Sequence, residues 1–139
     1  MRDDLSRLFD NIIKFQNKKI ELLTGFRNKE FELKHILSGR LEDEIIDIIN
    51  NQNAIIEKID ICDFEVAGYI DKVKRITGID LRITSDKKYI SDETKLDAFN
   101  DNIKSIEVLL DEINRRREDN IETMKQIADE TSQSGDELN

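Results

Sequence analysis

Residues 41–76 read LEDEIIDIINNQNAIIEKIDICDFEVAGYIDKVKRI, and this stretch decides the fold. Alternating steps of four and three residues select a series of side chains that is apolar or nearly so except at Gln52. The series consists of Leu41, Ile45, Ile48, Gln52, Ile55, Ile59, Cys62, Val66, Tyr69, Val73 and Ile76. Such a 3.5-residue repeat is the seam of a coiled-coil-like helix, because a slightly underwound α-helix shows one stripe to its neighbour throughout. With no Pro and only Gly68, the stretch predicts a single helix, about 55 Å long at about 1.5 Å per residue.

The residues before this stretch carry the same repeat on a wider apolar face. Lys19 and Lys29 interrupt it, and their aliphatic stems can lie along the groove while the ammonium groups reach water. The repeat consists of Leu5, Leu8, Ile12, Phe15, Lys19, Leu22, Phe26, Lys29, Leu33 and Ile36, and it is widened by Phe9, Ile13, Ile20, Leu23 and Leu37. A face of this width predicts a helix over 4–37 that touches two neighbours, as in a bundle.

The phase of the apolar series shifts between the two repeats, at residues 38–40 (SGR). A strict repeat continued from the first helix would require Arg40, but the second series starts at Leu41. Gly39 can end the first helix in a left-handed cap, and the acidic residues 42–44 suit the positive N-terminal end of the next helix. A tight αα-hairpin explains both features. The alternative, which the sequence leaves open, is a continuous helix with a four-residue stutter through Leu33, Leu37, Leu41 and Ile45.

The remaining residues predict a third helix after a long connection. The second helix should end at Gly78, and residues 79–90 read as a loop whose role the sequence leaves open. Ser91 is a good N-cap for a helix over 92–130. Its seam consists of Leu96, Phe99, Ile103, Ile106, Leu110 and Ile113.

The third seam weakens after Ile113, because the next positions of the repeat are Arg117 and Asn120. Apolar residues then resume at Ile121, Met124, Ile127 and Ala128, and the bundle should loosen between the two parts. Residues 132–139 are polar and acidic without periodicity, which predicts a disordered tail. We therefore predict an all-α fold: an elongated antiparallel three-helix bundle, made of a long helical hairpin plus a third helix with coiled-coil-like packing. It forms one domain over 1–131.

The charge distribution excludes several classes of partner. The net charge is −9, with balances of +2 over residues 1–38, −3 over 39–91 and −8 over 92–139. Nucleic acids and anionic membranes need a basic footprint, so neither is expected as the main partner. The chain shows no long apolar run or signal-peptide core, so we expect no membrane insertion. The single Cys62 on the apolar stripe indicates a reducing compartment, and we expect a cytoplasmic protein.

No motif of enzymatic chemistry is present, and we expect no catalytic, metal-binding or cofactor-binding residue. Residues 35–39 (HILSG) resemble the HxLKG phosphoacceptor motif of histidine phosphotransfer domains, with Ser38 in place of Lys. We interpret His35 as a surface residue near a helix C-terminus, with phosphotransfer as a minor alternative. Cys62 should be buried and inert. The triplet 115–117 (RRR) is followed by two acidic residues and should form a salt-linked helix face.

The whole pattern resembles the FlgN-like flagellar export chaperones, which are small acidic proteins of long antiparallel helices. The resemblance lies in the first helix with KKIELL at 18–23, the turn at 38–40, NAIIEKID at 53–60 and NIETM at 120–124. It implies a cytoplasmic chaperone that binds the C-terminal helices of flagellar hook–filament junction proteins. Such a chaperone prevents their premature assembly and delivers them to the type III export apparatus.

The family binds its clients through the C-terminal helix, so the resemblance implies a partner-binding site in the corresponding part of this chain. That site consists of Ile113, Arg117, Ile121, Met124, Ile127 and Ala128. The implied partners are hook-associated proteins and components of the export gate, and a homodimer is left open. The competing interpretation is a structural coiled-coil adaptor or self-associating helical bundle without a chaperone role.

Overall fold

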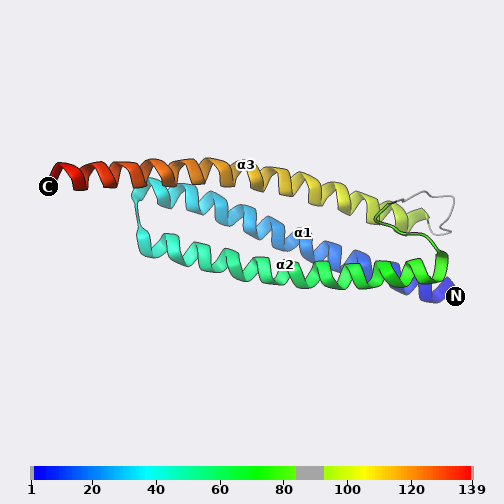
Figure 1. The fold of residues 1–139 in the computed structure, drawn as a ribbon. Coiled ribbons are helices and arrows are strands. Elements are labelled where there is room, and N and C mark those ends of the chain that lie inside the picture. The colour runs from blue at the N-terminus through cyan, green and yellow to red at the C-terminus, as the bar shows by residue number, and fades with distance from the viewer. Residues whose placement is uncertain (1, 84–92, 139) are drawn as a thin grey trace.

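Three long helices run side by side along one axis (Figure 1). The computed structural model describes the backbone of residues 2–83 and 93–138, and the side chains of residues 4–83 and 94–132. The helices are α1 (Arg2–Gly39), α2 (Glu42–Thr77) and α3 (Glu93–Leu138). They run up, down and up, so α1 and α3 point the same way while α2 runs against both. The predicted all-α three-helix bundle is confirmed.

The first helix is the centre of the molecule. α1 packs along both α2 and α3, whereas the backbones of α2 and α3 stay largely apart (Figure 1). The two neighbours expected for the wide apolar face of α1 are therefore observed. The sequence had suggested that the stripe over 41–76, now in α2, organises the chain, and the structure corrects this. A narrow seam is covered by one partner, but a wide face buries its apolar surface only against two.

The core consists of three clusters that follow one another along α1. The first lies near the start of α1 and contains Phe9, Ile12, Ile70, Val73, Leu81, Leu96 and Phe99. Its Phe9 and Phe99 rings meet edge to face, with centroids 6.4 Å apart. The middle cluster contains Leu23, Phe26, Leu109 and Ile113. The last contains Leu33, Leu37 and Ile48, with Met124 and Ile127 packed against it.

The turn between α1 and α2 is a tight hairpin, as predicted, and not a stutter in a continuous helix. α1 ends at Gly39, and the backbone N–H of Arg40 donates to the Leu37 carbonyl at 3.2 Å. The left-handed residue is Arg40, with φ 54°, and not Gly39 as expected from the sequence. A side chain in this region costs about 1–2 kcal/mol. The Arg40 guanidinium also pairs with Glu130 of α3, which helps to offset that cost.

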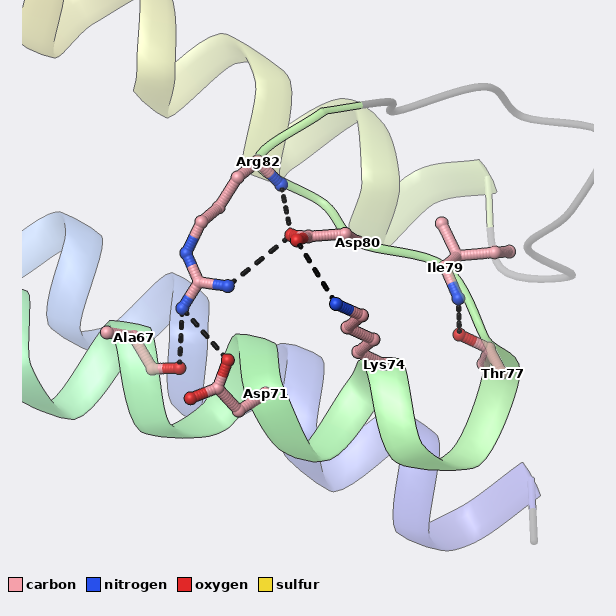
Figure 2. Close-up of polar contacts among 7 residues, drawn as sticks. All are labelled: Ala67, Asp71, Lys74, Thr77, Ile79, Asp80 and Arg82. Atoms are coloured by element: carbon pink, nitrogen blue, oxygen red, sulfur yellow. Dashed lines mark hydrogen bonds and ion pairs between the residues drawn. The ribbon is translucent and has the colours of Figure 1, made fainter.

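The end of α2 is reinforced by the residues that follow it (Figure 2). Gly78 has φ 75°, and its N–H donates to the Lys74 carbonyl at 2.7 Å. Arg82 then reaches back along α2, where Nη2 donates to Asp71 Oδ1 at 3.1 Å and to the Ala67 carbonyl at 3.2 Å. Residues 79–83 thus lie against the helix they follow. The rest of the predicted loop, 84–90, and the predicted cap at Ser91 lie outside the described residues.

The last helix is longer than the sequence suggested. α3 is helical through Leu138, whereas the predicted helix ended at 130 and was followed by a disordered tail at 132–139. Once a helix has formed, each added residue gains a hydrogen bond at little further entropic cost. The segment contains no Pro, and Gly135 costs only about 1 kcal/mol relative to Ala in a helix. Polar composition alone therefore does not end α3, and the division into a domain over 1–131 and a tail stays a prediction.

Candidate helix-binding groove

A buried polar layer joins the three helices about three quarters of the way along α1. It consists of Glu30 from α1, Gln52 from α2 and Asn120 from α3, whose exposed fractions are 3%, 6% and 2%. Gln52 Nε2 donates to Glu30 Oε1 at 2.9 Å, and Asn120 Nδ2 donates to Glu30 Oε2 at 2.7 Å. The same Asn120 nitrogen also lies 3.0 Å from the Glu30 carbonyl oxygen. Arg117 Nε lies 3.8 Å from Glu30 Oε1 and supplies a nearby positive charge.

This layer corrects the expectation that the bundle loosens after Ile113. Arg117 and Asn120 are poor residues for an apolar seam, but here they meet a buried carboxylate that needs donors and a cation. A buried polar group left without a partner costs about 1–3 kcal/mol, so the amide hydrogen bonds fasten α3 to α1 at this point. The sequence showed Gln52 as an isolated exception in the seam, and its partner on another helix could not be identified from spacing.

A groove opens beyond the polar layer, where α1 ends and α2 begins. Its volume is about 600 Å³, and Met124, Ile127 and Ala128 of α3 form one side of it. The other lining residues are Leu37, Arg40, Glu42, Ile45, Thr131 and Ser132. We call this hollow the terminal groove. Its walls are mainly apolar, and its rim carries the Arg40 and Glu42 charges, which is the usual character of a surface that receives an amphipathic helix.

A second apolar stripe on α2 leads into the terminal groove. Ile45, Ile49, Gln52, Ile56 and Ile59 follow the seven-residue repeat. Ile45 lines the terminal groove together with Met124 and Ile127, and Ile59 packs against the middle cluster to which α3 contributes Leu109 and Ile113, so this stripe faces α3. Ile49 and Ile56 share that face, yet both are exposed, because the backbones of α2 and α3 stay apart.

A matching stripe runs along α3. Leu110, Arg117, Ile121, Met124 and Ala128 follow one another at spacings of three, four or seven residues. Arg117 reaches towards Glu30 in the layer shared with Gln52, so the stripe faces α2. Leu110 and Ile121 remain exposed. We call the combined surface of Ile49, Ile56, Leu110 and Ile121 the α2–α3 face.

The six residues predicted to bind a partner fall into three groups. Ile113 is buried in the middle cluster and is part of the core. Arg117 and Ile121 are exposed, and the Arg117 guanidinium lies 5.8 Å from the centre of the Phe26 ring. Met124, Ile127 and Ala128 line the terminal groove. The sequence analysis did not propose Ile49, Ile56 or Leu110 as partner-binding residues. The second seven-residue series on α2 could have indicated the first two.

The other candidate residues behave as surface or core positions. His35 is exposed on α1, one turn before that helix ends at Gly39. Cys62 is buried, and burial raises the pKa of its thiol, while the nearby Lys18 acts in the opposite direction. A raised pKa leaves little thiolate at neutral pH, in agreement with an inert residue.

The basic triplet forms the predicted salt-linked helix face. Arg115 pairs with Asp111, and Arg116 lies 3.8 Å from Glu112. The Arg116 guanidinium also covers the Phe31 ring at 3.3 Å from its centre. The two ion pairs lie within α3, whereas the Arg116–Phe31 contact joins the outer side of α3 to α1, as does the pair of Arg27 with Glu112 at 3.1 Å.

Neither a metal centre nor a membrane span is found in the described part of the chain. Within residues 4–83 and 94–132, whose side chains the structure describes, no three side chains of His, Cys, Asp or Glu are grouped to bind a metal ion. Over the same residues, none of the helices combines the length and apolar character that crossing a bilayer requires. Comparison of the chain with protein-family models, curated proteins and solved structures gave no match. The likeness to FlgN-like chaperones therefore depends on the sequence features alone.

Proposed function

We propose that this protein is a cytoplasmic export chaperone similar to the FlgN-like proteins. In this role it binds the C-terminal helix of a flagellar hook–filament junction protein, prevents its premature assembly and delivers it to the type III export apparatus. The observation that supports the proposal is the exposed α2–α3 face, which continues into the terminal groove. Both surfaces are apolar, and both include residues of α3, the C-terminal helix of the kind that the family uses for its clients.

An amphipathic helix is the occupant that fits this surface best. α1 packs between α2 and α3, so the three helices leave room for a fourth on the side where α2 and α3 are apart. Ile49 and Ile56 are seven residues apart, which corresponds to about 10.5 Å along a helix. A bound helix with apolar residues at the same seven-residue repeat would place its apolar side chains between the exposed side chains of the α2–α3 face, as in a four-helix bundle.

One end of the bound client helix would lie in the terminal groove. Met124 is flexible and polarisable, so it adapts to side chains of different shape. A client helix covered in this way would have its own apolar stripe removed from water, and could not use that stripe to assemble with other subunits. Because the contact is mainly apolar, raising the salt concentration from about 0.1 to 0.5 M should change the affinity little.

Two single substitutions test the proposal with a matched control. Ile121→Glu and Ile49→Glu each place a charge on the α2–α3 face, whereas Val108→Glu places the same charge elsewhere on α3. Ile121 and Val108 are 45% and 65% exposed, so neither change should unfold the bundle. Peptides of the last forty or so residues of hook–filament junction proteins are titrated by isothermal calorimetry. We expect at least tenfold weaker binding for the two face variants and no change for Val108→Glu, since a buried unpaired charge is costly.

Two other results would change the proposed client site or the proposed function. Equal affinities for all three variants would place the client site elsewhere. No binding of any junction protein, together with a dimer in light scattering that Ile121→Glu dissociates, would favour the self-associating adaptor. Deleting residues 115–139 is a poorer test, because it also removes Asn120 from the buried polar layer.

A further inference from the structure

Two hollows lie on the side of the molecule formed by α1 and α2 alone. One has a volume of about 390 Å³ and is lined by Asp4, Arg7, Leu8, Lys72, Arg75 and Ile76. The other, of about 680 Å³, is lined by Lys14, Phe15, Lys18, Glu21, Leu22, Gly25, Ile55, Lys58, Ile61 and Cys62. Their positions repeat every seven residues, as in Leu8, Phe15 and Leu22 of α1, so the hollows follow one another along a single face. No residue of α3 lines either of them.

An aromatic pair borders the second hollow, which Phe15 itself lines. The Phe15 ring of α1 stacks on the Tyr69 ring of α2, with centroids 6.0 Å apart. Lys14 lies 5.8 Å from the centre of the Phe15 ring, and Lys72 lies 5.3 Å from that of Tyr69. Each ring of the pair thus has a lysine ammonium group close to it. Leu8 and Leu22 lie fourteen residues apart, so the hollows are separated by about 21 Å along the helix axis.

The charge of this face is opposite to that of the chain. The lining residues of the two hollows include six basic and two acidic side chains, on a protein with a net charge of −9. The six are Arg7, Lys14, Lys18, Lys58, Lys72 and Arg75, and we call them the basic strip. Within the part of the chain that the structure describes, none of the six makes an ion pair, whereas Lys19, Arg27 and Arg82 do. Their positive charge is therefore available to a partner.

We propose that the basic strip binds an amphipathic helix of another protein whose polar flanks are acidic. Two apolar side chains of that helix, two heptads apart, would enter the two hollows, and glutamate or aspartate side chains beside them would pair with the lysines. The partner segment must span about 21 Å, which requires at least four helical turns. The strip lies on α1 and α2, so this partner is distinct from the client that we place on the α2–α3 face. Both can be bound at once.

Other polyanions fit this face less well. A nucleic acid would stack its bases on open aromatic rings, but Phe15 and Tyr69 stack on each other and lie beside lysines. An extended polyanion would also meet repulsion from the remainder of the acidic chain. A lipid surface is flat, whereas the apolar atoms here line hollows between two helices. A helix with its own protruding side chains matches that shape.

The test uses the full chain and a synthetic stapled helix of about three heptads, with leucine at the apolar positions and glutamate beside them. A second peptide carries lysine in place of each glutamate. Fluorescence anisotropy should give a Kd of about 10 µM or tighter for the glutamate peptide, and no binding of the lysine peptide. Lys18→Glu combined with Lys58→Glu should weaken binding at least tenfold. Lys104→Glu combined with Lys125→Glu, two exposed lysines of α3, should change it less than twofold.

Further measurements separate this site from the alternatives. In the bound state, amide chemical shift changes should lie in α1 and α2 at the two hollows, and Ile121→Glu should leave them unchanged. Absence of binding, or equal binding to both charge-reversal variants, would overturn the proposal. So would tighter binding of oligo-dT, or of vesicles of phosphatidylglycerol and phosphatidylcholine, that is lost in the Lys18→Glu/Lys58→Glu variant. A dimer of the chain that the same variant dissociates would make a second copy the occupant.

Discussion

Two regions of the bundle, the apolar cluster near the start of α1 and the Glu30 layer further along it, are built from different chemistry. Near the start of α1, the core around Phe9, Val73 and Phe99 is apolar, and all three helices contribute to it or pack against it. Further along, the same helices meet around the Glu30 carboxylate, which Gln52 and Asn120 satisfy from two sides. The apolar end gains from removing hydrocarbon from water, at about 25 cal/mol per Å². The polar layer gains much less, because its groups were already hydrogen-bonded to water in the unfolded chain.

The difference suggests a division of roles. Apolar side chains pack against many partners, so a purely apolar seam allows helices to slide by a heptad. A carboxylate with donors on two other helices is satisfied in only one alignment. We infer that the apolar end supplies most of the stability, while the Glu30 layer fixes the helix register beside the terminal groove. Four variants, one of them a triple substitution, test this comparison.

The largest effect is expected at the apolar end. Phe99→Ala removes a buried ring that meets Phe9 edge to face, and it leaves a cavity. The free energy of unfolding should fall by about 3–5 kcal/mol. Urea unfolding followed by circular dichroism measures this. Val108→Ala, at an exposed position of the same helix, is the control and should change the value by less than about 0.5 kcal/mol.

A smaller loss is expected from one member of the polar layer. Asn120→Ala removes the donor to Glu30 Oε2 and leaves a buried carboxylate oxygen without a partner. Hydrogen bonds to charged groups contribute about 1.5–3 kcal/mol, and the free energy of unfolding should fall by that amount. Asn114→Ala on the exposed side of α3 is the matched control. A loss as large as that of Phe99→Ala would contradict the proposed division of roles.

Replacing the whole layer should cost little stability but should impair alignment. Glu30→Leu, Gln52→Leu and Asn120→Leu together remove every polar atom that needs a partner. Exchanging buried charged groups for apolar ones is often neutral or stabilising, so we expect between no change and a gain of about 2 kcal/mol. If the helices lose their fixed register, the amide NMR signals of residues around 30, 52 and 120 should be broadened or doubled. A single sharp spectrum would show that the layer does not set the register.

The smallest effect is expected at the surface. Lys19 Nζ lies 2.7 Å from Asp63 Oδ1, in a pair between α1 and α2 whose Asp63 side is about half exposed. Water and salt screen such pairs, and Lys19→Ala should lower the free energy of unfolding by only about 0.2–1 kcal/mol. The loss should shrink further when unfolding is repeated at about 1 M salt. An effect of several kcal/mol would place surface charge among the main determinants of this fold.

The sequence predicted most of the local structure. The heptads gave the three helices, the phase shift at Leu41 gave the hairpin, and Gly78 marked the end of α2. The sequence prediction of Gly39 as the left-handed residue at the hairpin was wrong, since that residue is its neighbour Arg40. Nor did the sequence predict the end of α3, because polar composition weakens packing without preventing helix formation.

Of the candidate site, Met124, Ile127 and Ala128 were predicted and now line the terminal groove. Leu37 and Ile45, on its other walls, were assigned only to the helix seams. The sequence does not show that they line a groove, because a seam residue at the end of a helix is covered only if the neighbouring helices reach that far. By itself, the sequence determined which residues form helices and which stripe of each is apolar, because both depend on spacing along one chain. Only the tertiary structure decided that α1 lies in the middle, that Glu30 meets Gln52 and Asn120, and which apolar side chains stay uncovered. These depend on distances between helices that are far apart in the sequence, and periodicity carries no information about them.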